Sequence, residues 1–445
     1  MYIRCKMTSY RVIERQNSIA EKEGSLVSLE RELFPPEYKL IPQIRQIYEL
    51  NLAYAEYKAL TAEELIHRGA YFQSIDGRLT NHFRICMVTP NQVSASAGQA
   101  RKNFFAANIF AVGYATHGLF PYRGKFHPQM IKAIMNIIGL RKGDIVLDPM
   151  VGCGTTLIEA TVIGVDSIGI ELSPFACLMS RAKLGALQTD CTIFPDLLAE
   201  SEKILDYFDK DMSYHKQHAL STGPIDIPAL FKERPELRAI LELCYLDTIG
   251  YARRRKSKSV KELFPQVFKR YLAAIKAFNA VRRELQMEPG ASEVIQGDAR
   301  RICLDDQSID GIIFSPPYSF AVDYVENDRP QLEYMGIDVH SLKSKMVGLR
   351  QPNTMVVSST RARVDLYFAD MEQILYECSR VLKQGRYCVI VIGSNTRQTG
   401  GIILEEGIIQ RAEKVNLTLK HQVVRDIEGI RNTMRQEYVL FFEKS

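Results

Sequence analysis

From about residue 143 onward, short apolar runs rich in β-branched residues alternate with amphipathic stretches. This alternation is typical of a parallel sheet with helices on both faces, because strands buried on both sides are apolar throughout. It predicts an α/β, Rossmann-like fold in which we expect the third strand to lie beside the first. The predicted strands are 144–149, 166–172, 292–299, 308–318 and 385–393, and the predicted helices are 155–164, 173–187 and 371–383; a further helix, 402–416, and two strands, 419–427 and 436–444, end the chain.

Two regions stand outside this pattern. About 100 polar, helix-rich residues, 188–290, separate the second helix from the third strand, which is far more than a usual connection. We interpret them as a helical insertion into a core made of 119–187 and 291–445. Residues 1–118 carry helical signals and are predicted to form a mostly helical N-terminal extension.

Composition narrows the class of protein. With 46% hydrophobic and 24% charged residues, the chain has the composition of an ordinary soluble globular protein. Its nine cysteines form no CxxC pair and have no histidine at metal-ligand spacing, so we expect reduced thiols and no metal site. No signal region opens the chain, and no apolar run approaches the roughly 20 residues of a membrane span. We therefore expect a cytoplasmic protein that does not contact a membrane.

The formal net charge of +5 is weak evidence for a polyanionic partner, but the charge is unevenly distributed. Basic residues gather in the predicted insertion with few acidic neighbours, as expected for a surface that faces nucleic-acid phosphates. A solvated helical face would give the same pattern, so both interpretations stay open. The candidates for phosphate contact are Arg253, Arg254, Arg255 and Lys256.

The segment DPMVGCGTT, 148–156, falls where the first strand ends and the first helix begins. Gly152 and Gly154 let the backbone approach a ligand, while the helix start offers unpaired N–H groups. Glu171 ends the next strand, where a carboxylate can accept both hydroxyls of a ribose. No glycine-rich run followed by lysine occurs, so a nucleoside without pyrophosphate is predicted; the alternative is a tight turn with a surface glutamate. The cofactor-binding candidates here are Asp148, Pro149, Gly152, Gly154, Thr155, Thr156, Glu171 and, at the end of the third strand, Asp298, which could accept a hydrogen bond from an adenine amino group.

The tetrapeptide SPPY, 315–318, directly follows an apolar strand. Its two prolines remove two backbone donors and leave a rigid loop of carbonyl acceptors. Such acceptors suit an exocyclic amine, which is a poor nucleophile whose protons must be held while its nitrogen faces a methyl donor. A proline-stiffened loop with a packing tyrosine is the alternative. The catalytic candidates are Ser315 and Pro316, which would hold the amine, Pro317, and Tyr318, on which an extruded base would stack.

Together, DPMVGCGTT and SPPY resemble the S-adenosylmethionine-dependent amino-methyltransferases of DNA, which modify cytosine N4 or adenine N6. SPPY is more frequent among the cytosine enzymes. The resemblance covers about 116–445 apart from the insertion, and it implies a class I methyltransferase sheet with an antiparallel finish and S-adenosylmethionine as cofactor. It also implies that Lys125, His127, Pro128 and Gln129 close over the methionine end of the cofactor, and that Tyr324 lies near the catalytic loop and the nucleic acid.

The resemblance further implies direct in-line methyl transfer to cytosine N4, without a covalent enzyme intermediate. The substrate would be double-stranded DNA with a flipped target base, modified at specific sites as in restriction-modification systems, and a cognate restriction endonuclease is a candidate partner. Methylation of adenine N6 in DNA and of amines in RNA are alternatives, because similar loops occur in those enzymes. A catalytically silent nucleic-acid-binding subunit is a further alternative.

Overall fold

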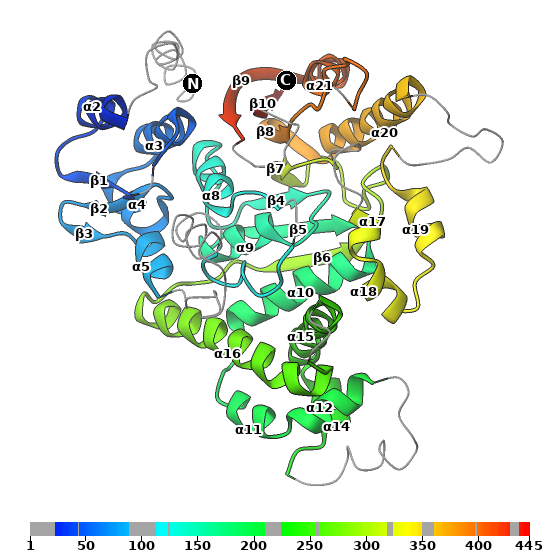
Figure 1. Ribbon diagram of the computed structural model, residues 1–445. Helices are drawn as coiled ribbons and strands as arrows, with labels where there is room; N and C mark the ends of the chain where they lie inside the picture. Colours follow the sequence, from blue (N-terminus) through cyan, green and yellow to red (C-terminus); the bar gives the residue numbers. More distant parts are fainter. Residues whose placement is uncertain are drawn as a thin grey trace.

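The computed structural model contains a central seven-stranded sheet that joins segments far apart in the sequence (Figure 1). Its parallel central strands and their flanking helices follow the α/β pattern that the sequence predicts. The structure describes residues 23–42, 44–88, 113–122, 125–209, 224–254, 258–317, 324–348, 360–396, 398–427 and 436–445.

The strand order of this sheet is β6-β5-β4-β7-β8-β10-β9. The first five strands in this order run parallel, and β10 pairs antiparallel with both β8 and β9. The predicted strands and the antiparallel finish are thus confirmed. The third strand is an exception: β6 pairs with β5, and β4 lies between β5 and β7, so the expectation that it adjoins the first strand is wrong. The strands are β4 Ile145–Asp148, β5 Asp166–Glu171, β6 Ser292–Gln296, β7 Ile309–Phe314, β8 Leu382–Ile392, β9 Leu417–Asp426 and β10 Gln436–Lys444.

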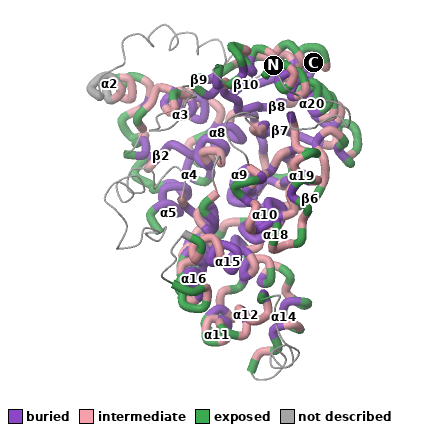
Figure 2. The backbone as a smooth tube through the Cα atoms, turned by 45° about the vertical axis from the view of Figure 1, so that its right-hand side comes forward, coloured by how far each residue is buried: buried purple, intermediate pink, exposed green. Residues whose placement is uncertain are grey.

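Successive residues of each central strand point to opposite faces of the sheet, and this alternation divides the core into layers. Val146 and its equivalents in β7, β8 and β10 pack with helix α8, Pro128–Ile137, on one face. The adjacent Leu147 and its equivalents pack with α20, Thr360–Val381, and α21, Leu404–Lys414, on the other. These strands form the buried centre of the molecule (Figure 2).

The N-terminal region packs on the α8 face of the sheet and shares its hydrophobic cluster (Figure 1). It is helical as predicted, but it also contains a three-stranded antiparallel sheet that the prediction omitted. The turn between the second and third of these strands is formed by Asp76 and Gly77, both with positive φ. The elements are α2 Glu23–Leu33, β1 Tyr38–Leu40, α3 Ile47–Ala59, α4 Ala62–Arg68, β2 Phe72–Ile75, β3 Arg78–Leu79 and α5 Asn81–Met87.

The described part of the insertion is helical, as the sequence predicts. Most of its buried apolar residues belong to one cluster with the core helix α10, Pro174–Gln188, against which α15 packs, so the insertion is continuous with the core. Several of its basic side chains are paired internally: Arg270 with Asp247, and Lys261 with Glu202 at 3.1 Å. The helices are α11 Phe194–Ala199, α12 Ser201–Phe208, α14 Ile227–Glu233, α15 Pro235–Arg254 and α16 Val260–Glu284.

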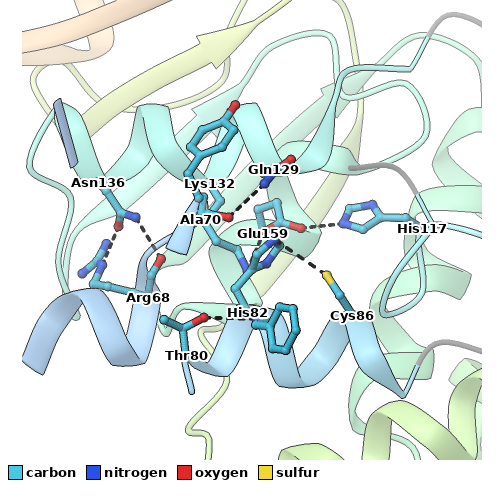
Figure 3. A network of polar contacts seen from close by, with 12 residues as sticks. Arg68, Ala70, Thr80, His82, Cys86, His117, Gln129, Lys132, Asn136 and Glu159 are labelled. Carbon is cyan, nitrogen blue, oxygen red and sulfur yellow. Dashed lines mark hydrogen bonds and ion pairs between the residues drawn. The ribbon is translucent and has the colours of Figure 1, made fainter. Parts of the chain in front are cut away.

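A buried polar chain connects the N-terminal region to the core at α9, Thr155–Val162 (Figure 3). Glu159 of α9 accepts a hydrogen bond from the His117 ring at 2.6 Å and lies 3.2 Å from the Lys132 ammonium. Lys132 also contacts His82 Nδ1 at 3.0 Å, and His82 Nε2 lies 3.7 Å from the Cys86 sulfur. Burial lowers the pKa of His117 to about 4, so its neutral ring donates to the glutamate. This network of polar contacts keeps the opposite charges of Lys132 and Glu159 together in the interior.

Among the helices of the described ranges, none combines the length and the apolar character that crossing a membrane would require. Nor do the described residues contain a group of three or more His, Cys, Asp or Glu side chains that could hold a metal ion.

We predict that Gly290→Ala destabilises the fold, because a Cβ atom there would lie 2.0 Å from the carbonyl oxygen of Val165. The backbone must shift to relieve this contact, at a cost of about 1–3 kcal/mol in the free energy of unfolding. Gly113→Ala is the matched control, since its Cβ would meet no atom within 4 Å. Equal midpoints of urea unfolding for the two variants would contradict the prediction.

We also predict that Glu159→Gln lowers the free energy of unfolding by about 3–5 kcal/mol, because it leaves the buried ammonium of Lys132 without its counter-charge. The double variant Glu159→Gln/Lys132→Met removes both charges and should be more stable than the single variant. Urea unfolding of the two proteins beside the wild type measures this. A double variant that is less stable than Glu159→Gln would show that the charge pair is not the cause.

Candidate active site

The loop after β4 is held by the carboxylate of Asp148. Its Oδ2 accepts a hydrogen bond from Thr156 Oγ1 at 2.6 Å, and its Oδ1 accepts one from the backbone N–H of Met150 at 3.0 Å. Burial raises the pKa of Asp148 to about 7, while these two hydrogen bonds oppose that shift. Asp148 and Thr156 are both buried, and neither lines the cavity described below. They therefore set the shape of the loop from behind.

Two glycines allow this loop to turn sharply into α9. Gly152 and Gly154 have φ of 50° and 85°, a region that residues with a side chain rarely adopt. Gly154 is also the N-cap of α9, and a Cβ atom there would lie 3.0 Å from Ser180 Oγ on the neighbouring helix. At Gly152 the loop thus presents backbone rather than a side chain to the space beyond the strands.

Glu171 connects the end of β5 to the same loop. Its Oε2 accepts the N–H of Gly152 at 2.9 Å, and its Oε1 accepts the N–H of Ser173 at 2.8 Å. Burial raises the pKa of this carboxyl, and the backbone donors pull it back down. Since each carboxylate oxygen can accept more than one hydrogen bond, both can also accept from a ligand.

A cavity of about 1030 Å³ lies over the carboxyl ends of the parallel strands. This is where ligands bind in open α/β sheets. It brings together nine of the residues singled out from the sequence, which come from five separate segments of the chain. They are Lys125, Pro149, Gly152, Thr155, Glu171, Asp298, Ser315, Pro317 and Tyr324.

The SPPY loop follows β7, whose six residues are all buried. Ser315 and Pro317 line the cavity, and Pro316 between them is buried. Tyr318 lies outside the described residues.

Asp298, after β6, is held by Arg300, a residue that the sequence interpretation did not single out. The Arg300 guanidinium donates to both Asp298 oxygens at 2.7–3.1 Å, to Asp370 at 3.0 Å and to the carbonyl of Lys345 at 2.7 Å. One arginine therefore ties the edge strand to α20 and to α19, Val339–Lys345. No motif marks Arg300 in the sequence; only the three partners identify its role.

The segment before α8 reaches the site through Lys125. Its ammonium donates to the carbonyl of His117 at 3.4 Å, and burial lowers its pKa to about 8. His127 is the N-cap of α8 and Pro128 its first residue, and neither lines the cavity. The side chain of Gln129 donates to the carbonyl of Ala70 at 3.0 Å, so it joins the N-terminal region to α8.

One wall of the cavity was not foreseen from the sequence. It consists of three short helices after the SPPY loop, together with Tyr122. Val325, Asp328 and Leu332 come from the first two of these helices and their junction. The first two helices are α17 Tyr324–Asn327 and α18 Arg329–Tyr334, and α19 follows them.

Of the basic residues proposed for phosphate contact, Arg253 lies in the last turn of α15 and does not line the cavity. Arg253 is exposed there. Arg254 ends the helix, with its side chain outside what the structure describes, and Arg255 and Lys256 lie outside the described residues.

Comparison with known proteins gives matches in this part of the chain. Residues 119–204 match the family described as "RMKL-like, methyltransferase domain". The chain is 46% identical over 68 residues to the type II methyltransferase M.MjaII of Methanocaldococcus jannaschii, covering 15% of this chain and 13% of that protein. It is 22% identical over 290 residues to the type II methyltransferase M.BsoBI of Geobacillus stearothermophilus, covering 51% of this chain and 54% of that protein.

A third relative is the tRNA (guanine(10)-N2)-dimethyltransferase of Methanothermobacter thermautotrophicus, which is 38% identical over 53 residues. That match covers 12% of this chain and 16% of the relative. The chain thus spans about half or less of the length of each of these proteins. From the strand order, the glycine loop and these matches, we conclude that the chain contains a class I methyltransferase domain whose cofactor is S-adenosylmethionine.

Proposed function

We propose that this protein transfers a methyl group from S-adenosylmethionine to an exocyclic amine of a DNA base, namely N4 of cytosine. The observation that supports this most directly is one shared cavity. Ser315 and Pro317 of the SPPY loop line it together with Gly152 and Glu171. A methyl donor held by Gly152 and Glu171 would lie within reach of an amine held by the SPPY loop.

The cavity fits the cofactor chemically. Glu171 would accept the ribose hydroxyls, because both of its oxygens retain acceptor capacity beside Gly152 and Ser173. Asp298, held in place by Arg300, would accept the amino group of adenine. The glycine loop leaves room for the nucleoside, and Lys125 lies at the same cavity for the carboxylate of the methionine part. When bound, the cofactor supplies a methyl group activated by a positively charged sulfur.

The protein's own contribution to the reaction is to orient the amine. The Ser315 hydroxyl and the Pro316 carbonyl would hold its protons, so that the nitrogen lone pair faces the methyl group in line with the bond that breaks. Tyr318 and Tyr324 would offer aromatic faces to a base extruded from the helix. No covalent intermediate on the enzyme is needed.

Double-stranded DNA is the proposed nucleic acid because two of the relatives are named as type II methyltransferases, and such an enzyme would have a cognate restriction endonuclease as its partner. Arg253 to Lys256 would contact its phosphates. An RNA amine is the second candidate, because a third relative is named as a tRNA dimethyltransferase. N6 of adenine in DNA would use the same chemistry on another base.

We predict that Glu171→Gln weakens the binding of S-adenosylmethionine. Loss of a charged acceptor costs about 1.5–3 kcal/mol, which corresponds to a dissociation constant about 10- to 100-fold higher. Isothermal titration calorimetry measures it. Glu293→Gln, an exposed glutamate on β6 of the same sheet, is the matched control and should bind as the wild type does. Unchanged affinity in Glu171→Gln would remove Glu171 from the cofactor site.

We further predict that the wild-type chain transfers a tritiated methyl group to genomic DNA, with N4-methylcytosine as the product in nucleoside mass spectrometry. Ser315→Ala should lower kcat about 100-fold, as expected for losing one group that acts on the transition state, and should leave cofactor binding intact. Ser308→Ala, a half-buried serine just before the same strand and outside the cavity lining, is the control. N6-methyladenine would change the base, and label only in RNA would favour the second candidate.

A further inference from the structure

A second cavity, of about 690 Å³, adjoins the first. The two share Tyr122, Tyr324 and Asp328, so one wall belongs to both. A ligand in the second cavity therefore lies next to whatever fills the first. Its other lining residues are Phe120, Pro121, Asp247, Gly250, Asn327 and Gln331, which come from the segment before α8, the insertion helix α15 and the α17–α18 wall.

Two side chains that can accept hydrogen bonds, Asp328 and Gln331, line this second cavity. Asp328 is 9% exposed, and within the described part of the chain its carboxylate makes no hydrogen bond or ion pair. Gln331, one helical turn further, is 6% exposed, and its Oε1 has no hydrogen-bond partner there either. Burying an acceptor such as Gln331 Oε1 without a hydrogen-bond partner costs about 1–3 kcal/mol. A ligand that donates N–H groups would remove this cost.

The shared wall also provides flat apolar surfaces. The rings of Tyr122 and Tyr324 are nearly parallel, with an interplanar angle of 20° and centroids 6.4 Å apart. Aromatic faces of this kind stack with bases irrespective of their sequence. Acceptors and ring faces together suit a planar ligand that carries an amino group, which is what a nucleobase with an exocyclic amine presents.

We propose that the second cavity receives the methyl-accepting base, and that Asp328 shares with the SPPY loop the acceptance of an N–H of its exocyclic amine, while Gln331 accepts a further donor of the base. This rests on the proposed function and adds to it a residue outside the SPPY loop. In the transfer, the nitrogen lone pair forms the new N–C bond as the S–C bond breaks, and the sulfur keeps the bonding pair. The proton that the nitrogen sheds passes to the carboxylate of Asp328.

The electrostatic surroundings of Asp328 agree with this role. Burial, followed by the negative charge of Glu171, raises its pKa to about 7. The other ionisable groups around the two cavities are Tyr122 and Tyr324 on the shared wall, Asp247 on α15, and Lys125, Cys153, Asp298, Arg300 and Lys345 in the first cavity. A carboxyl that ionises near neutral pH can take a proton from an amine and return it to solvent. The value of kcat/KM should therefore rise with pH through about 7.

The test compares full-length wild type, Asp328→Asn and Asp338→Asn for tritiated-methyl transfer to genomic DNA between pH 6 and 9. Asp338 caps α19 by accepting from the backbone N–H groups of His340 and Ser341, a task that asparagine also performs, so this control should match the wild type. Asp328→Asn should lower kcat/KM about 100-fold and remove the rise near pH 7. Its dissociation constant for S-adenosylmethionine, measured by calorimetry, should stay within threefold of the wild-type value.

A second variant, Gln331→Met, tests the cavity itself independently of proton transfer. It should raise KM for DNA about tenfold with kcat nearly unchanged, because methionine is similar in size to glutamine but lacks the amide acceptor. If Asp328→Asn keeps the wild-type kcat/KM and pH profile, this inference is overturned while the proposed function stands. Weaker cofactor binding by Asp328→Asn at unchanged KM for DNA would also overturn it, because the carboxylate would then face the cofactor. No transfer by the wild type would overturn the proposed function and this inference with it.

Discussion

The site depends on two carboxylates placed at the carboxyl ends of neighbouring strands. Asp148 and Glu171 accept backbone N–H groups of one loop, at Met150 and Gly152, and so close it against the sheet. Burying these groups raises the pKa of both, which measures the free energy that burial costs the ionised forms. The hydrogen bonds offset that cost only while the loop keeps this shape. This shape requires the positive φ of Gly152 and Gly154, and it places the start of α9.

The elements around this loop are held by charges that reach across the chain. Arg300 joins the edge strand to α19 and α20. Arg270 pairs with Asp247 inside the insertion and joins it to the segment before α8 by donating to the carbonyl of Leu119 at 3.3 Å. A buried charge needs its partners close by, because leaving one unpaired costs several kcal/mol. These arginines therefore keep the two cavities side by side.

The insertion gains a specific place in this arrangement. Its helix α15 contributes Asp247 and Gly250 to the second cavity, while its exposed end carries Arg253. One helix thus runs from the proposed base pocket to the proposed phosphate contact. A helix is a rigid connection, so binding of the phosphates would position the base relative to the methyl donor.

Most of the fold and part of the site follow from the sequence alone, because their causes are local. The alternation of Val146 and Leu147 predicts a strand buried on both faces, and Gly152, Gly154, Glu171 and the SPPY loop mark strand ends by residue type. The hairpin at Asp76 and Gly77 also has a local signal, since Asp-Gly favours the turn that tightly joins two strands, although the prediction passed over it.

Only the tertiary structure decided the rest. The position of β6 beyond β5 depends on the path of the crossovers and not on the residues of the strand. Arg270 looks like a surface cation in the sequence until Asp247 is found beside it. Asp328 follows no motif, and its proposed role comes from burial beside Tyr122 and Glu171, which are more than 150 residues away in the chain. Local residue type determined the elements and the loops, whereas burial and charge pairing between distant segments determined which of their side chains meet.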